Sequence, residues 1–267
     1  GIVLDYGCQN NNITHNRIHD NKANGIYLWQ YISQPLNANN TIAHNNISSQ
    51  IVGIRVSGSA NVIENNMISH SLAAGILCGG NSNIITGNIL CHGGVSGVKL
   101  RYSASNNVIY HNSIQNNTRS GLVIYSSCEN NSITKNDYIE NNISCQVYDD
   151  GQGNLFDGNF FSNWNAPDRD RDSIVDFPYP VAGESGNSDW TPKTLPNCDL
   201  PGWYKYKEVS AVTKSKPLPI PGLVVSSIPI LIIAVFVAAI RVKKKRASGG
   251  TGVSHNDHHQ RPEIPYS

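Results

Sequence analysis

Charged side chains are scarce in this chain, and the two signs nearly cancel. The 267 residues include 20 Lys and Arg against 19 Asp and Glu, which gives a formal net charge of +1. Overall charge therefore gives no indication of a nucleic-acid partner or of an acidic substrate. The scarcity is greatest in residues 9–165, yet this stretch carries an Ile or Val every few residues, which disordered chains lack.

Paired cysteines are also missing, because the chain has neither a C-x-x-C pair nor zinc-finger spacing. The cysteines stand singly, at Cys8, Cys78, Cys91, Cys128, Cys145 and Cys198. Two interpretations remain open. Either the thiols are small buried apolar residues, or they form one or two disulfides, since the topology inferred below places all of them outside the cell.

Asparagine is abundant where charge is scarce, and it recurs at fixed spacing. The pattern N-x-I-x-x-N-x-I occurs in seven rows. The first Asn of each row and the apolar residue two places on are Asn11, Asn40, Asn61, Asn83, Asn107, Asn131 and Asn154, with Ile13, Ile42, Ile63, Ile85, Ile109, Ile133 and Phe156. The second Asn and its apolar residue are Asn16, Asn45, Asn66, Asn88, Asn112, Asn136 and Asn159, with Ile18, Ile47, Ile68, Leu90, Ile114, Tyr138 and Phe161. All four columns share the spacings 29, 21, 22, 24, 24 and 23, which indicates a repeat protein.

A second pattern, G-[IVL]-x-[LVIC], follows each of the first five rows. It begins at Gly25, Gly53, Gly75, Gly97 and Gly121, and at Cys145 the glycine is replaced. Gly1 opens the same pattern in the middle of a coil, so we expect the natural chain to begin upstream.

Each repeat therefore holds two or three short segments of alternating polarity between Gly, Asn and Ser turns, which is typical of strands. Strands this short become stable by stacking at the ~4.8 Å strand spacing, with Ile columns inside and Asn ladders at the bends. Glycine suits either a turn with positive φ or a close approach of coils. The sequence predicts an all-β fold, a single-stranded right-handed parallel β-helix with about 22–24 residues per coil.

These repeats resemble the NosD-like, carbohydrate-binding and sugar-hydrolase (CASH) class of parallel β-helix proteins over roughly residues 1–195. In that class the last segment usually contains G-N-Y-W-S-D-Y, then D-x-D-x-D-G-I-x-D-x-P-Y and D-x-x-P-L. This chain has Gly158-Asn-Phe-Phe-Ser-Asn-Trp164, Asp168-Arg-Asp-Arg-Asp-Ser-Ile-Val-Asp176, Pro178-Tyr179 and Asp189-Trp-Thr-Pro192, with Ser173 in place of the glycine. The resemblance implies a β-helix that binds carbohydrate, or one that handles copper as NosD relatives do.

The chain changes character after the repeats. We expect a β-helix at 1–165, an acidic terminal segment at 166–196, a Pro-rich stalk at 197–221, a membrane helix at 222–240 and a cytoplasmic tail at 241–267. The helix segment carries no charge and is long enough to span a bilayer, and the cations that follow it favour a cytoplasmic tail. The prediction is a single-pass cell-membrane protein whose β-helix is extracellular. The Pro-Gly, short span and basic cluster are similar to archaeal C-terminal sorting signals, which suggests an archaeal source.

The strongest local motif is a run of carboxylates on alternate residues of one loop. Such carboxylates can converge on a hard cation together with a main-chain carbonyl. The candidate ligands are Asp168, Asp170, Asp172, Ile174, Asp176 and Asp189. We expect a structural calcium that caps the open end of the β-helix. The alternative is a solvated loop of mixed charge, since Arg169 and Arg171 lower its negative charge.

One outward face combines aromatic rings with cations. In G-I-x-L-x the apolar residues point inward and the x positions point outward. The candidate ligand-binding residues on this face are Tyr27, Trp29, Arg55, Lys99, Arg101 and Tyr125. Sugar rings stack on aromatic faces, and Arg or Lys can pair uronate carboxylates, so the face is a candidate polysaccharide site. The alternative is an ordinary solvent-facing strand surface.

A catalytic set is not complete in these residues. Pectinase-type β-helices use clustered Asp residues or an Arg-Lys set, whereas the acids of these repeats are scattered and only Asp149 and Asp150 are adjacent. His15, His44 and His111 share one column, but Asn65 and Gly87 stand between them, so three histidines cannot meet around copper.

The sequence thus predicts a cell-surface binding or structural protein that recognises polysaccharide or cell-envelope components. Two alternatives remain. One is a polysaccharide lyase or hydrolase whose catalytic coils lie upstream, and the other is NosD-like periplasmic copper handling.

Overall fold

A computed structural model of the chain describes residues 1–30, 37–141 and 145–198. In these residues it contains no helix with the length and apolar character needed to cross a bilayer. The predicted membrane helix at 222–240 and the predicted cytoplasmic tail lie outside the described residues, as does the predicted stalk beyond residue 198.

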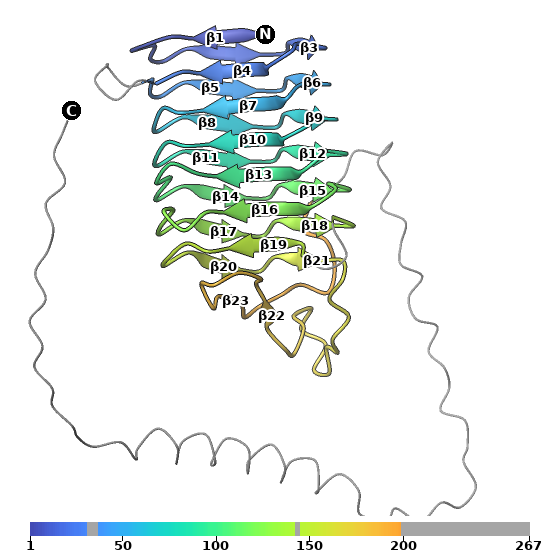
Figure 1. Ribbon diagram of the computed structural model, residues 1–267. Helices are drawn as coiled ribbons and strands as arrows, with labels where there is room; N and C mark the ends of the chain where they lie inside the picture. The colour runs from blue at the N-terminus through green and yellow to red at the C-terminus, as the bar shows by residue number, and fades with distance from the viewer. Residues whose placement is uncertain (31–36, 142–144, 199–267) are drawn as a thin grey trace, which may run out of the picture. The chain divides into compact units, whose positions relative to one another are not determined.

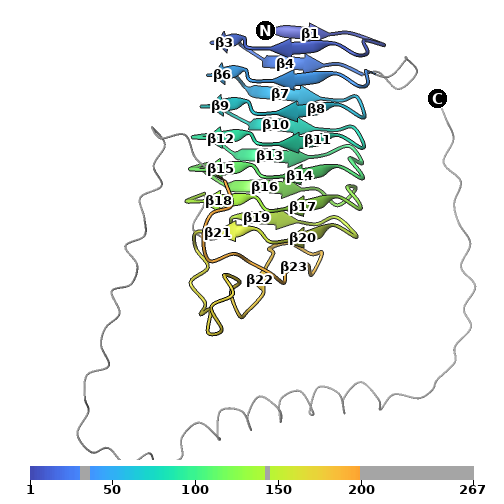
Figure 2. The same cartoon turned by 180° about the vertical axis from the view of Figure 1, so that it is seen from behind.

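Three parallel sheets of seven strands each run along a stack of coils (Figure 1). The first sheet contains β1 (Ile2–Leu4), β4 (Asn24–Leu28), β7 (Val52–Val56), β10 (Ala74–Cys78), β13 (Ser96–Leu100), β16 (Ser120–Ile124) and β19 (Val147–Asp149). The second contains β2 (Asn12–Thr14), β5 (Thr41–Ala43), β8 (Val62–Glu64), β11 (Ile84–Thr86), β14 (Val108–Tyr110), β17 (Ser132–Thr134) and β20 (Leu155–Asp157). The third contains β3 (Arg17–His19), β6 (Asn46–Ser48), β9 (Met67–Ser69), β12 (Ile89–Cys91), β15 (Ser113–Gln115), β18 (Asp137–Ile139) and β21 (Phe160–Phe161). The chain visits the three sheets in turn, and each strand pairs with its equivalent one coil further on, as the view from behind also shows (Figure 2).

The register of these sheets confirms the predicted apolar columns. The column from Ile13 to Phe156 is in register across the second sheet, and the column from Ile18 to Phe161 is in register across the third. Both columns are buried along their whole length and form one core with the inward residues of the first sheet. The predicted all-β parallel solenoid is therefore confirmed.

Both Asn columns form hydrogen-bonded ladders at the bends. At each rung the backbone N–H and the side-chain Nδ2 of one Asn donate to Oδ1 of the Asn one coil further on. In the other column, both donors of Asn88 lie 3.0 Å from Oδ1 of Asn112, and Nδ2 of Asn88 also reaches the carbonyls of Ile63 and Thr86. These bonds satisfy polar groups whose burial would otherwise cost free energy. We call the column from Asn11 to Asn154 the first amide column and that from Asn16 to Asn159 the second.

The residue before each ladder Asn has a left-handed backbone. For example, φ is +58° at His15 and +56° at His44, which precede rungs of the second amide column. Asn, Asp and His tolerate this region better than most residues do. The bend positions therefore select these residue types for backbone reasons, whatever else the side chains do.

The glycines of the second pattern allow a close approach of coils. A Cβ at Gly75 would lie 2.8 Å from the carbonyl oxygen of Gly97 and 2.9 Å from Cδ2 of Leu90. At the last such position the register pairs Leu122 with Val147, so Gln146 takes the place of the glycine. The prediction of Cys145 there is wrong by one position, because this coil is one residue longer than the coil before it.

An aromatic stack closes the core at its C-terminal end. Phe161 stacks between Tyr138, at 5.3 Å between ring centroids, and Tyr179, at 3.7 Å, and Trp164 meets Tyr179 edge-on. Tyr179 belongs to β22 (Tyr179–Pro180), which pairs antiparallel with β23 (Ser188–Asp189). The segment after β21 thus extends the core by one aromatic layer.

Half of the six cysteines fit the interpretation as small core residues. Cys78, Cys91 and Cys128 are buried, and Cys8, Cys78, Cys128 and Cys145 are free thiols. Burial raises the pKa of the Cys78 thiol to about 12, so this thiol is not a reactive nucleophile at neutral pH.

Candidate functional site

The outer face of the first sheet carries the predicted ligand-binding residues. Its outward column runs through Val3, Tyr27, Arg55, Leu77, Lys99, Val123 and Tyr148, in register from strand to strand. The residue after each strand continues the face: the backbone N–H of Trp29 donates to Leu4, that of Arg101 to Cys78, and that of Tyr125 to Leu100. Because the interior is filled by the apolar columns, the face is where this sheet can meet a ligand.

Four residues on the first coils form an aromatic cluster, which we define as Tyr6, Tyr27, Trp29 and Arg55. The Trp29 ring lies 5.4 Å from the ring of Tyr6 and 6.1 Å from that of Tyr27, between centroids. The guanidinium carbon of Arg55 lies 4.8 Å from the centroid of the Tyr27 ring. Nε of Arg55 is buried without a hydrogen-bond partner among the described residues, and Trp29 remains 38% exposed. The cluster therefore offers a ring face and a guanidinium at one place.

A second group lies further along the same sheet, around a hollow of about 440 Å³ that we call the basic hollow. It is lined by Val95, Ser96, Lys99, Arg119, Ser120, Val123, Tyr125, Cys145 and Tyr148. Arg101 stands beside it, with its guanidinium carbon 4.8 Å from the centroid of Tyr125 and 5.0 Å from that of Tyr102. Burial, together with the charges of Arg101 and Arg119, lowers the pKa of Lys99. The lining contains two cations and no carboxylate.

The structure therefore divides the six predicted face residues into two groups. Tyr27, Trp29 and Arg55 belong to the aromatic cluster, and Lys99 and Tyr125 line the basic hollow with Arg101 beside them. Leu77, only 9% exposed, lies between Arg55 and Lys99 in the column.

Three residues of these groups were not found from the sequence. Tyr6 and Arg119 lie outside the G-I-x-L-x pattern, and Tyr148 lies in the coil where the glycine is replaced. Extending the register by one residue at Cys145 would have revealed Tyr148, because it continues the column of Lys99 and Val123.

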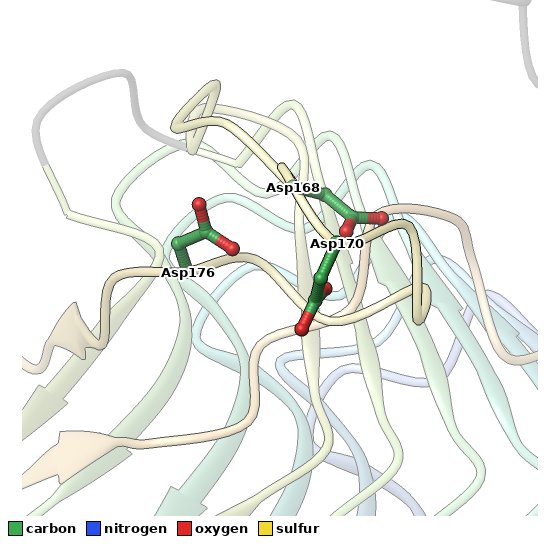
Figure 3. Close-up of side chains that lie close together, drawn as sticks. All are labelled: Asp168, Asp170 and Asp176. Atoms are coloured by element: carbon green, nitrogen blue, oxygen red, sulfur yellow. The ribbon is translucent and has the colours of Figure 1, made fainter.

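The acidic loop, residues 168–176, brings three of the predicted metal ligands together. Carboxylate oxygens of Asp168, Asp170 and Asp176 lie within 4.8 Å of one another. Figure 3 shows Asp168 and Asp170 on one pass of the loop and Asp176 on the returning pass. Main-chain N–H groups hold the loop: Arg171 and Ser173 donate to Asp168, and Arg169 donates to Asp176. Three carboxylates of this kind form a possible site for a hard cation.

The convergence does not include the carboxylates of Asp172 and Asp189, and ligation by the Ile174 carbonyl stays a prediction. Asp172 accepts a hydrogen bond of 2.7 Å from the backbone N–H of Ile174, and Ile174 pairs with Lys193 in an isolated bridge. Asp189 is fully buried at the end of the second amide column, where Oδ2 accepts hydrogen bonds from both the backbone N–H and Nδ2 of Asn159. Its Oδ1 accepts from Gly158 and Thr191. Asp189 therefore accepts the last hydrogen bonds of the second amide column.

Buried carboxylates also end other hydrogen-bonded elements near the last coil. Asp149 accepts hydrogen bonds from Nδ2 of Asn154, the last rung of the first amide column, and from Nδ2 of Asn187. Asp137 accepts hydrogen bonds from Asn197 and from the backbone N–H of Cys198. Burial raises the pKa of Asp137 and of Asp189. The adjacent acids of the sequence, Asp149 and Asp150, therefore do not act as a matched pair: one is in the core and the other accepts from the backbone N–H of Glu184.

The histidines pair across neighbouring coils without assembling a larger metal-ligand set. His15 stacks on His44 at 5.1 Å, and His70 stacks on His92 at 5.3 Å, between ring centroids. In residues 1–30, 37–141 and 145–198, the cluster of Asp168, Asp170 and Asp176 is the one place where three His, Cys, Asp or Glu ligand atoms converge. Copper prefers imidazole and sulfur ligands to an all-carboxylate set. The described residues therefore hold no converging set of three or more imidazole or sulfur ligands.

Comparison with known proteins gives a family and a set of structural neighbours. The family model described as "Periplasmic copper-binding protein (NosD)" matches residues 1–188. The crystal structure of the periplasmic alginate epimerase AlgG is similar with 19% sequence identity and a TM-score of 0.46, covering 61% of this chain and 36% of that chain. A double mutant of the same epimerase is similar with 17% identity and a TM-score of 0.44, covering 70% of this chain and 38% of that one. The chain thus spans little more than a third of the epimerase chains, and no curated protein matches it.

Proposed function

Since this chain belongs to the NosD family of periplasmic copper-binding proteins, we propose that it works outside the cytoplasm, as a membrane-anchored β-solenoid that binds polysaccharide. The binding surface is the outer face of the first sheet. The anchor is the uncharged segment at 222–240, whose length and following cations suit a single membrane span.

The aromatic cluster is the observation that carries this proposal. Pyranose rings have apolar faces that pack on indole and phenol rings, and their hydroxyls bond to guanidinium N–H groups. Trp29 and Tyr27 supply such rings next to Arg55, whose Nε lacks a partner among the described residues. A ligand hydroxyl at Arg55 would satisfy this buried donor.

Binding is favoured over hydrolysis by the side chains of the basic hollow. A hydrolase needs two carboxylates on either side of the scissile bond, and the basic hollow is lined by none. Because Lys99 and Arg119 line the hollow, a lyase that uses an Arg-Lys set stays an alternative. NosD-like copper handling also stays an alternative, since two pairs of histidines stack across neighbouring coils.

We further propose that the acidic loop binds calcium in a structural role. The supporting observation is the convergence of Asp168, Asp170 and Asp176 within 4.8 Å. The loop follows the last coil, so the ion would stiffen the segment that supplies Tyr179 to the end of the core.

A glycan array probed with the full chain in detergent tests the binding function. We expect binding to extended polysaccharides, and loss of about tenfold or more in affinity for Trp29→Ala, because one aromatic–sugar contact is worth about 1–2 kcal/mol. Trp190→Ala is the matched control, since Trp190 is also an exposed indole, 74% exposed, but lies in the terminal segment.

Unchanged binding of the Trp29→Ala variant across the array would disprove the assigned surface. A reducing-end release assay on every bound glycan separates binding from cleavage, and steady release of new ends would favour the lyase or hydrolase alternative.

A further inference from the structure

The basic hollow concentrates positive charge on a chain that has almost none overall. Lys99 and Arg119 line it, and Arg101 stands beside it on the two tyrosine rings. The formal net charge of the whole chain is only +1, so this grouping is local. Like charges held near one another repel, and an arrangement of this kind costs free energy unless an anion joins it.

No protein carboxylate neutralises these cations among the residues that the structure describes. The ion pairs found there join His19 to Asp20 and Arg169 to Asp176. Asp150, in the same coil as Tyr148, accepts a hydrogen bond from the backbone N–H of Glu184, and its hydrogen bond with Tyr148 raises the pKa of that phenol. The neighbouring arginines and burial lower the pKa of Lys99, which agrees with a cation that lacks an anionic partner.

A buried hydroxyl in the hollow also lacks a partner. Ser96 is 0% exposed, lines the hollow, and its Oγ makes no hydrogen bond among the described residues. Because Ser96 is fully covered, its hydroxyl belongs to the floor of the hollow and is not a contact for a ligand.

The rings of the hollow suit a sugar that carries the anion. Tyr125 and Tyr148 come from neighbouring coils, and both are more than a third exposed. Neighbouring strands are ~4.8 Å apart, which is comparable to the length of one pyranose unit in an extended chain. A polymer lying along the sheet would then present one sugar per coil.

We propose that the basic hollow binds the carboxylate of a uronate unit between Lys99 and Arg119, while the sugar ring packs on Tyr125 or Tyr148. This inference rests on the proposed polysaccharide-binding function and names its substrate class: acidic polysaccharides. The aromatic cluster then supplies affinity for sugar rings in general, and the hollow supplies the preference for charge.

The test compares two forms of one polymer, polygalacturonate and its fully methyl-esterified form, which share a backbone and differ in charge. Calorimetric titration of the full chain is expected to give at least tenfold tighter binding to the acid form, because charge-assisted hydrogen bonds are about twice as strong as neutral ones. Lys99→Gln and Arg119→Gln should each lose about tenfold or more for the acid form, a larger loss than either variant shows for the ester.

Matched controls separate this effect from misfolding and from loss of net charge. Arg17→Gln removes one exposed cation from the third sheet and should leave both affinities unchanged. Arg119→Lys should retain most of the preference, and thermal melting of each variant shows that it is folded.

The outcomes distinguish the two proposals. Equal binding of both polymer forms, or equal losses for both forms in the Lys99 and Arg119 variants, overturns the uronate inference and leaves polysaccharide binding in place. A wild-type chain that binds no glycan on the array and neither polymer form overturns both. Binding to dextran sulfate as tight as to polygalacturonate overturns the assignment to a carboxylate.

Discussion

Asp189 shows how a single residue can end a repeat. Every rung of the second amide column donates its backbone N–H and its Nδ2 group to the Oδ1 of the next rung, so the last rung, Asn159, needs an acceptor from outside the repeat. A carboxylate supplies it, with Oδ2 taking both donors at 2.9 and 2.8 Å. Because the amide dipoles of the ladder all point the same way, the end that presents donors favours negative charge, as the N-terminus of a helix does.

We predict that Asp189→Asn destabilises the fold by about 1–3 kcal/mol, because Asp189 accepts through both oxygens and an amide has only one. Either the donors of Asn159 or the N–H groups of Gly158 and Thr191 would then face an amide nitrogen. Urea denaturation followed by circular dichroism measures the change. Glu129→Gln, an exposed acid-to-amide change, is the control and should stay within about 0.5 kcal/mol of the wild type. Equal stability of the two variants would show that Asp189 does not terminate the ladder.

The stability of the wild type and that of Asp189→Asn should also depend differently on pH. Burial raises the pKa of Asp189 above its ordinary value of 3.8, so the folded chain holds the proton more tightly than the unfolded chain. The resulting stabilisation is fully present below the ordinary value and is lost as pH rises through the folded-state pKa. The stability difference between wild type and Asp189→Asn should therefore shrink as pH rises above the ordinary value of 3.8, and a difference that grows instead would contradict the shift.

At the scale of elements, the ladders rather than the strands hold the bends in place. The strands contain two to five residues each, too few to be stable alone. The Oδ1 of a ladder Asn accepts two hydrogen bonds from the Asn of the coil before it, and its own N–H groups donate to the Asn of the coil after it. Each coil is therefore hydrogen-bonded to both of its neighbours.

We predict that Asn88→Ala costs on the order of 3 kcal/mol. The change leaves the backbone N–H of Asn66 without its buried acceptor and removes the Nδ2 donor that reaches the carbonyls of Ile63 and Thr86. Asn46→Ala is the matched control, since Asn46 lies on β6 with its side chain exposed, and it should change stability by less than about 0.5 kcal/mol. Chemical denaturation of both variants is the measurement, and similar losses would refute the structural role of the amide columns.

The acidic loop gives a second prediction at this scale. Calcium titration of the full chain should release heat and raise the melting temperature, since an ion that binds only the folded state stabilises it. Asp170→Asn should abolish both effects, whereas Asp172→Asn, outside the three-carboxylate cluster, should weaken them less. Absence of heat and of a melting shift in the wild type would remove calcium from the description.

For the whole molecule, the sequence predicts that a β-solenoid is attached to a membrane by residues outside the described structure. The full chain should sediment with membranes and resist carbonate extraction, because about 20 apolar residues suffice to span the hydrocarbon core. A chain ending after residue 198 retains every described strand and should be soluble. Identical fractionation of the two chains would exclude the anchor at 222–240.

Much of the fold could be predicted from the sequence because the repeat is strictly periodic. The Ile and Asn columns recur at matching spacings, and a parallel stack converts each column into a ladder with one register. The prediction from the repeat failed at Cys145, because the coil there is one residue longer than the coil before it. The pairing of Leu122 with Val147 shows that Gln146 occupies the glycine position.

The candidate sites were predicted in part, because their residues lie where the repeat is irregular. Tyr27, Arg55 and Lys99 were found, since they occupy outward positions of a repeating strand. Arg119 and Tyr148 line the basic hollow but were missed. Arg119 lies outside the repeating outward positions, and Tyr148 is shifted by one residue because the coil at Cys145 is longer.

The sequence by itself determined the coil period, the buried columns and the amide ladders, because each depends on contacts between equivalent residues one repeat apart. The tertiary structure decided the rest. Asp189 lies at the end of the second amide column and not in the acidic loop. Lys99, Arg119 and Ser96 line one hollow. Such groupings join non-equivalent positions of different coils, and their distances follow from the packing of the coils rather than from the repeat.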